Sequence, residues 1–188
     1  MTRSQYCQSS ILAAASALLF SACATTKMES TLTPGAEPHR FRRVMVILPL
    51  RPFEKRELVE KEFAEGSTPG TTFIPSYPVL IAGLEYSDAE ITRILEPHKV
   101  DALLQLSLTS STVKPHYVAV QGTGFDVYKP EAEFELQLFC IEDGIVVWSS
   151  SAETKGGGFA TADDLLRSLA RKTVEQLAKD GLVNGATR

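Results

Sequence analysis

The feature that most constrains the fold is a strict alternation of polar and apolar residues across residues 131–138. Because successive side chains of a strand point to opposite faces, this alternation predicts a strand with one face buried and the other in water. Such a strand belongs to an antiparallel sheet that is covered on one side only. The polar parity holds Glu131, Glu133, Glu135 and Gln137, and the apolar parity holds Ala132, Phe134, Leu136, Leu138 and Cys140.

Upstream of this strand the pattern predicts two βα units and a third strand. The run at 44–50 is apolar on both parities, which indicates a central strand covered on both faces. A stripe of apolar residues predicts a helix over 54–65, and Ser87 with Glu90 forms a capping-box pattern that opens another helix. Short strands are expected at 71–75 and 102–108.

Downstream the rhythm changes to an antiparallel meander and a final helix. We expect 116–120, continued at 125–128, to pair with 131–141, and the hairpin signal at 142–144 to lead into a strand over 145–149. Thr161 is the expected N-cap of the long last helix, and Gly181 follows its end. The predicted fold class is therefore α/β (mixed α+β): a single domain with βαβαβ, then a three-strand meander and a C-terminal helix on one mixed sheet.

Composition limits the class of protein and its partners. The chain has 188 residues, is 44% hydrophobic and carries a formal net charge of -4. These values are typical of a globular domain, and they lack the basic excess that marks a nucleic-acid partner.

The N-terminal segment has the pattern of a targeting signal. Residues 11–20 form an uncharged apolar run that, as a helix, would reach only ~15 Å, which is typical of the core of a signal peptide. The following Ser21-Ala22-Cys23 resembles a bacterial lipobox. The resemblance implies cleavage between Ala22 and Cys23, a covalent lipid on Cys23, and, because Ala24 is not aspartate, the outer membrane. Plain secretion with cleavage after Ala24 is the alternative.

These observations divide the chain into four parts. They are a lipoprotein signal peptide (1–22), a flexible tether without apolar periodicity (23–43), the domain (44–183) and a disordered tail (184–188). After cleavage Cys140 would be the one unmodified cysteine, so no internal disulfide is expected, and its apolar parity predicts a small core residue. The lipid on Cys23 is the one covalent group expected.

No residue pattern predicts catalysis, a cofactor or a metal. The three histidines are scattered, and the chain has no HExxH, paired CxxC, GxSxG or Walker motif. The loop 155–158 before Thr161 could offer backbone N–H groups to an anion, but Asp163 and Asp164 occupy that positive helix end. We therefore expect a turn there and a protein that is not an enzyme.

Two exposed features are candidates for partner binding. The row Glu131, Glu133 and Glu135 either docks a basic partner or is a solvated sheet face. Trp148 and Tyr117, if exposed, would anchor a partner, although a tryptophan in a strand commonly packs against a neighbouring element.

Four segments together resemble a family of small bacterial lipoproteins of unknown function. These are Pro75-Ser76-Tyr77, Val100–Leu104, Gly144–Ser149 with its Val-Trp-Ser, and Asp180-Gly-Leu182. The expected protein is a lipid-anchored, non-catalytic binding or assembly accessory at the periplasmic face of the outer membrane, with an envelope protein as partner. A periplasmic binder of small molecules or cell-wall fragments is the alternative, and an envelope hydrolase the third.

The lipobox generates the first prediction. Cys23→Ser removes the thiol that would carry the acyl chains, each methylene of which contributes about 0.8 kcal/mol when buried in the bilayer. We expect the variant to keep its fold and to leave the membrane fraction on cell fractionation. A variant that stays membrane-bound would contradict the anchor.

Overall fold

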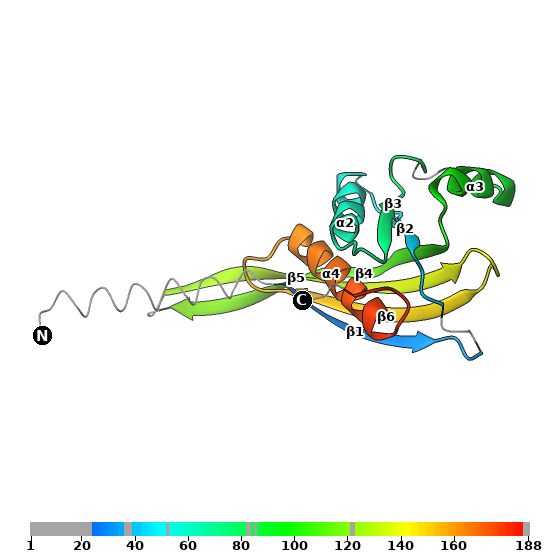
Figure 1. Cartoon of the computed structure of the whole chain (residues 1–188). Coiled ribbons are helices and arrows are strands. Elements are labelled where there is room, and N and C mark those ends of the chain that lie inside the picture. Colours follow the sequence, from blue (N-terminus) through cyan, green and yellow to red (C-terminus); the bar gives the residue numbers. More distant parts are fainter. Residues whose placement is uncertain are drawn as a thin grey trace, which may run out of the picture.

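A computed structural model of the chain describes residues 24–35, 39–51, 53–81, 84, 86–120 and 123–185. One six-stranded mixed sheet, in the order β1-β6-β5-β4-β2-β3, carries three helices (Figure 1). This confirms the predicted fold class. The elements are β1 (Ala24–Leu32), β2 (Arg43–Ile47), α2 (Phe53–Glu65), β3 (Thr72–Pro75), α3 (Asp88–Leu95) with a 3₁₀ turn at Glu96–His98, β4 (Ala102–Val120), β5 (Thr123–Cys140), β6 (Val146–Gly156) and α4 (Ala162–Lys179).

The sheet joins a parallel part to an antiparallel part at β4. β2 pairs in parallel with β3 and with the start of β4, because α2 and α3 each carry the chain back across the sheet. From β4 onward β5, β6 and β1 pair antiparallel.

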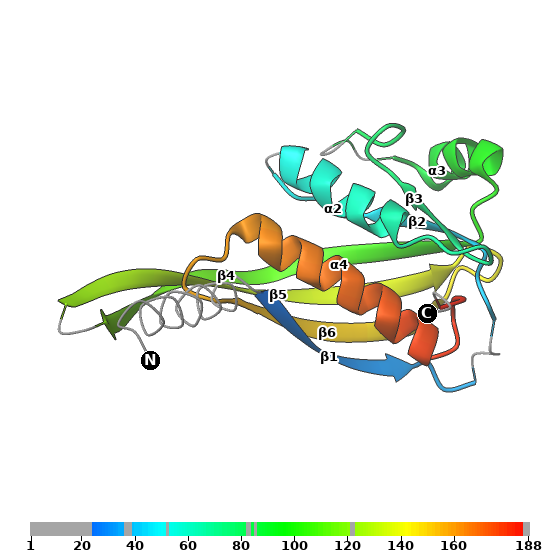
Figure 2. The same ribbon diagram turned by 60° about the vertical axis from the view of Figure 1, so that its left-hand side comes forward.

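The main core lies between one face of the sheet and the helices α2 and α4, which cover that face (Figure 2). Leu136 on β5, Leu104 on β4, Phe63 on α2 and Leu169 on α4 are fully buried there. The helices form where expected: Thr161 and Asp164 cap α4 reciprocally, and Ser87 and Glu90 do the same for α3. Gly181 has a φ of 79°, as the helix end requires.

A smaller core lies on the opposite face, at the β2 end of the sheet. Met45, Leu80, Leu95 and Val100 are buried there together. Because α2 and α3 lie on different faces of the sheet, β2 is covered on both sides, as its double apolar parity predicts.

The predicted tether over 23–43 is wrong in its larger part. Residues 24–32 form β1, an edge strand that pairs with β6 from Ala24↔Gly156 to Leu32↔Trp148. Its inward side chains are mostly polar or small, with Met28 as the one large apolar group packed on the core, so no hydrophobic period marks it in the sequence. They are held instead by hydrogen bonds, such as Thr26 Oγ1 to Thr154 Oγ1 (3.0 Å) and to Ser168 Oγ (2.9 Å).

The predicted domain boundaries also move. Phe41, within the predicted tether, is buried in the core, and its N–H donates to the carbonyl of Leu182 (2.8 Å). At the other end the N–H of Asn184 donates to Thr71 Oγ1 (3.0 Å), so the structured chain continues past 183. Residues 186–188 lie outside the described residues.

The predicted pairing of 116–120 with 131–141 is wrong. Residues 116–120 continue β4, which pairs with β5 along its whole length from Ala102↔Cys140 to Val120↔Thr123. Pro115 fits inside this strand because β4 pairs with β2 only through 102–105, which leaves its outer edge without a neighbouring strand. β6 is also longer than the predicted 145–149.

Asp180, at the end of α4, connects three elements of the main core. Its Oδ2 accepts hydrogen bonds from Ser30 Oγ on β1 (2.7 Å) and Trp148 Nε1 on β6 (2.8 Å). Its Oδ1 accepts from Gln176 Nε2 (3.0 Å). Burial alone would raise the pKa of Asp180, but these hydrogen bonds to the charged form outweigh it and hold the pKa below its ordinary value.

We predict that Asp180→Ala lowers the free energy of unfolding by about 1–3 kcal/mol, because it leaves the buried N–H of Trp148 without an acceptor. The measurement is urea unfolding, with Glu175→Ala, exposed on the same helix, as the near-neutral control. Since the pKa of Asp180 is lower in the folded state, its contribution is complete above about pH 4 and is lost as the pH falls through that lowered pKa. The difference in free energy of unfolding between parent and variant should therefore become smaller in acid. Equal free energies of unfolding at pH 7 would contradict the role of Asp180.

Candidate interaction surface

One face of the antiparallel part of the sheet is covered by no helix of the described chain (Figures 1 and 2). The strand register arranges the side chains of this open face in rows that run across the strands. One row is Glu29, Ser151, Glu135 and Ser107, and the next is Thr31, Ser149, Gln137 and Gln105.

A shallow hollow of about 410 Å³ lies over these two rows. Glu29 and Glu135 stand on opposite sides of Ser151, and neither forms an ion pair with another described residue. The hollow therefore carries negative charge among hydroxyl and amide groups, an arrangement that can accept hydrogen bonds from a cationic segment. Its lining residues are Glu29, Thr31, Glu135, Leu136, Gln137, Ser149, Ser150 and Ser151.

The predicted row of glutamates is divided by the structure. Glu135 lines the hollow, whereas Glu131 lies nearer the β4–β5 turn and pairs with Lys114 (Nζ to Oε2, 2.5 Å). Glu133 lies directly opposite Glu153, whose pKa is lowered by the hydrogen bond from Lys155. The face thus has mixed charge near the turn and is acidic at the hollow.

Glu29 was missed by sequence reasoning. It belongs to β1, whose two parities are both mostly polar, so the alternation that marks β5 is not visible there. Its pairing with Ser151 is what brings it to the hollow.

Trp148 is fully buried, so its prediction as an exposed anchor is wrong. The register pairs it with Leu138, whose parity faces the helices, and α4 covers both. Its indole N–H is directed to Asp180 beneath that helix.

The other predicted site residues lie apart from the hollow. Tyr117 is exposed, but it lies on β4 far toward the turn and on the parity of Ala132, which is the opposite face from Glu135. Ala22 and Cys23 lie outside the described residues, so cleavage and lipidation stay predictions.

The predicted turn over 155–158 begins later than expected, because Lys155 and Gly156 end β6 and the connection to α4 follows them. A Cβ added to Gly156 would lie 2.7 Å from Ala160 Cβ, so only glycine fits there. The following helix end is occupied by Asp164, whose Oδ2 accepts the backbone N–H (2.8 Å) and the hydroxyl (2.7 Å) of Thr161. These hydrogen bonds lower the pKa of Asp164.

A groove between α3 and the sheet was not foreseen. It has a volume of about 710 Å³, with Ile91 and Leu95 of α3 on one side and Leu103 and Phe139 of the sheet on the other. The predicted inward stripe of α3 therefore packs incompletely: Leu95 is buried, but Ile91 is only half-buried.

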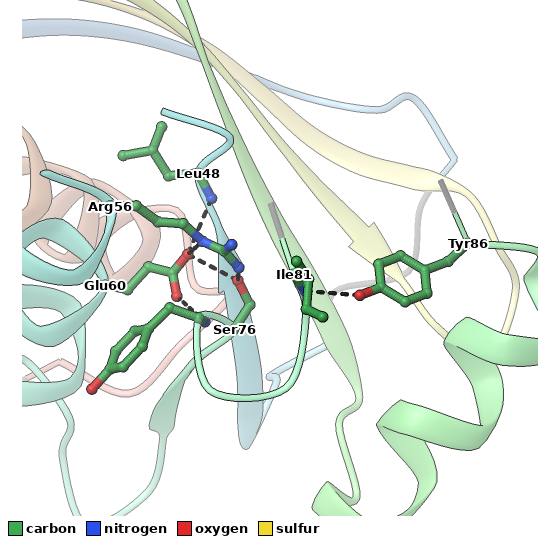
Figure 3. A network of polar contacts seen from close by, with 7 residues as sticks. Leu48, Arg56, Glu60, Ser76, Ile81 and Tyr86 are labelled. Carbon is green, nitrogen blue, oxygen red and sulfur yellow. Dashed lines mark hydrogen bonds and ion pairs between the residues drawn. The ribbon is translucent and has the colours of Figure 1, made fainter. Parts of the chain in front are cut away.

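A buried polar network lies under the start of α2 (Figure 3). Glu60 Oε1 accepts from Arg56 Nε and Ser76 Oγ, both at 2.8 Å, and Oε2 accepts from the N–H of Tyr77 (2.7 Å). Arg56 also donates to Ser76 Oγ (2.8 Å), and both charged side chains are buried. The network joins α2 to the turn after β3, which gives Ser76 of the Pro-Ser-Tyr segment a structural role. The four-residue spacing of Arg56 and Glu60 was the available signal.

We predict that Arg56→Met lowers the free energy of unfolding by about 3–5 kcal/mol, because it leaves the carboxylate of Glu60 buried without its cation. The double variant with Glu60→Gln removes that charge and keeps an acceptor oxygen, so it should recover most of the loss. Denaturant unfolding of parent, single and double variants measures both effects. If the double variant lost at least as much free energy of unfolding as Arg56→Met does alone, charge pairing would not be the cause.

The described residues contain neither a metal-ligand cluster nor a membrane-spanning helix. No three His, Cys, Asp or Glu side chains in this part of the chain lie close enough together to hold a metal ion. None of its helices is both long enough and apolar enough to cross a membrane.

Comparison with known proteins finds similarity in solved structures only. No protein-family model matches the chain, and no curated protein sequence matches it significantly. A variant of PelC from Paraburkholderia phytofirmans, a dodecamer, is 15% identical with a TM-score of 0.50, over 81% of this chain and 98% of that one. A second PelC dodecamer structure from that organism is 13% identical, with a TM-score of 0.48 over 84% and 99%. A lipoprotein from Neisseria meningitidis is 15% identical, with a TM-score of 0.42 over 73% and 99%. The first likeness shows a shared fold, and bacterial lipoproteins are among the similar structures.

Proposed function

We propose that the chain is a lipid-anchored envelope protein, held by Cys23 at the periplasmic face of the outer membrane, that acts by binding rather than by catalysis. The buried Glu60 and the half-buried Asp180 support this, because each holds structural elements together: Glu60 joins α2 to the turn after β3, and Asp180 joins α4 to β1 and β6. The lipobox-like Ala22-Cys23 supports the anchor.

The observation that carries the binding role is the open sheet face with its acidic hollow. Glu29 and Glu135 come from β1 and β5, so a rigid sheet holds the two carboxylates in a constant arrangement. A partner segment with lysine or arginine side chains complements this charge. Because Cys23 directly precedes Ala24, the anchor confines the hollow to a thin layer near the membrane, which raises the local concentration of any partner in that layer.

Self-assembly belongs to the same proposal. The PelC structure that shares the fold is a dodecamer. We therefore include further copies of this chain among the envelope components that bind it, alone or with a different protein.

Photo-cross-linking in cells tests the binding role. A photoreactive residue at Gln137, in the hollow, should give a discrete cross-linked product, whereas the same residue at Arg171, exposed on α4, should not. Reversing the charge with Glu29→Lys and Glu135→Lys should reduce the product by at least about fivefold, because like charges then face the cationic partner. Glu175→Lys on α4 is the matched control. An unchanged yield after the double reversal would contradict docking at the hollow.

The groove beside α3 favours a second candidate, a binder of a small apolar molecule or cell-wall fragment. Its volume of about 710 Å³ is in the range of ligand sites, and Leu103 and Phe139 form an apolar floor. Native mass spectrometry of protein purified from its own membranes tests this. A co-purifying mass that is lost in Leu103→Glu would support the binder, and a bare protein mass would contradict it.

A further inference from the structure

The β4–β5 hairpin extends well beyond the rest of the domain (Figures 1 and 2). β2 pairs with β4 only as far as Gln105, and β6 pairs with β5 only from Glu131 onward. Residues 113–130, apart from the undescribed 121–122, therefore form a two-stranded ribbon without a third strand beside it, and we call them the ribbon. A two-stranded ribbon has little burial of its own to stabilise it in water.

The two faces of the ribbon differ in character. The parity that continues the helix-covered face exposes Val113 (60%), Tyr117 (67%) and Tyr128 (62%). The opposite parity carries Lys114 and Lys129, which lie directly across from each other, and also the buried Val127. One face of the ribbon therefore exposes aromatic and aliphatic groups beside Asp126, and the other carries the two lysines.

Apolar exposure continues at the base of the ribbon. Phe159, in the loop between β6 and α4, is 55% exposed. That loop lies against the ribbon at Val127, on the parity of Lys129, because a Cβ added to Gly158 would lie 3.1 Å from Val127 Cγ2. Val113, Tyr117, Tyr128 and Phe159 thus expose apolar groups at one end of the molecule.

The chain enters the sheet at this same end. β1 and β5 are both antiparallel to β6, so they run in the same direction, and the start of β1 and the ribbon turn lie at one end of the sheet. Ala24 pairs with Gly156, and the neighbouring Lys155 pairs with Glu131 at the base of the ribbon. Residue 23 precedes Ala24 by one peptide unit, which separates their Cα atoms by about 3.8 Å.

We propose that the ribbon lies in the surface of the phospholipid bilayer, with Val113, Tyr117 and Tyr128 turned into the lipid. Tyrosine suits this position, because its ring is apolar and its hydroxyl remains hydrated. The described strands continue about seven residues past the base, or roughly 23 Å, so the ribbon is too short to cross a 30 Å hydrocarbon core even if it stood upright. A short element that exposes tyrosine and valine side chains on one face lies along the interface.

The position of the anchor is the reason for choosing lipid as the occupant of this face, so this inference rests on the proposed lipidation of Cys23. An acyl chain attached next to Ala24 places the lipid headgroups beside the base of the ribbon, with no tether between anchor and sheet. The lipid and the ribbon together would hold the sheet in one orientation on the membrane.

The test uses the mature chain, residues 23–188, made without its signal segment and with Cys23→Ser, so that no acyl chain is present. Residues 24–185 contain every described strand and helix. The probe is flotation with vesicles of phosphatidylethanolamine and phosphatidylglycerol. We expect the protein to float with the vesicles and the variant Tyr117→Ser with Tyr128→Ser to bind at least about tenfold more weakly. Ile81→Ser, 66% exposed in the segment after β3, is the matched control and should bind as the parent does.

Circular dichroism and size-exclusion chromatography of each variant without vesicles accompany the flotation. A folded parent that does not float, or a folded double variant that floats as well as the parent, overturns the proposal. The proposal is also overturned if the parent forms an oligomer in solution that the double variant loses, and the parent does not bind vesicles. That result would assign the face to contact with a second copy of the chain. The acylation of Cys23 is read separately, from the mass of the protein extracted from membranes, so failure of the anchor and failure of the ribbon give different results.

Discussion

Burial of one face of the β4–β5–β6 meander under α2 and α4 is the constraint on which the rest of the structure depends. Leu104, Leu136 and Trp148 supply the sheet side of this core, and Leu169 supplies the helix side. Because strand side chains alternate, burying one face determines which residues remain on the other. The polar open face, with its acidic hollow, is the direct consequence of packing the apolar one.

The edge strand β1 depends on polar contacts more than on apolar burial. Thr26 and Ser30 face the helix side. Thr26 forms a hydrogen bond with Ser168 on α4, and Ser30 donates one to Asp180 at the end of that helix. A hydrogen-bonded seam of this kind is specific in register, since a shift by one residue would turn these hydroxyls to solvent. The seam therefore sets where the chain leaves the sheet, and with it the position of the proposed anchor.

The two surfaces with a proposed role lie on opposite faces and at different places along the strands. The hollow lies on the open face above β1, β6 and β5, whereas Tyr117 and Tyr128 lie on the other parity of the ribbon. A domain held at the membrane by its anchor and ribbon could thus keep the hollow free for a partner. This separation follows from one long pair of strands that is covered by helices over part of its length only.

Much of the fold could be predicted from local pattern. The alternation of β5, the double apolar parity of β2 and the capping boxes at Ser87 and Thr161 each state a local preference that the packed domain satisfies. The strand β1 could not be predicted in this way, because polar residues on both parities carry no hydrophobic period. The full-length pairing of β4 with β5 could not be predicted for a related reason. Pro115 suggests that the strand ends before it, unless the strand is known to lie at an edge of the sheet.

The sequence by itself determined the mixed α/β class, the wet and dry faces of β5, and the cysteine that follows a signal-like segment. Only the tertiary structure decided that Trp148 is buried, that Glu29 joins Glu135, that Arg56 and Glu60 form a buried pair, and that the ribbon ends beside residue 24. The reason is physical: hydrophobic periodicity and capping are properties of neighbours in the chain. Register, edge position and the closeness of distant segments arise only when the strands pair and the helices cover one side of the sheet.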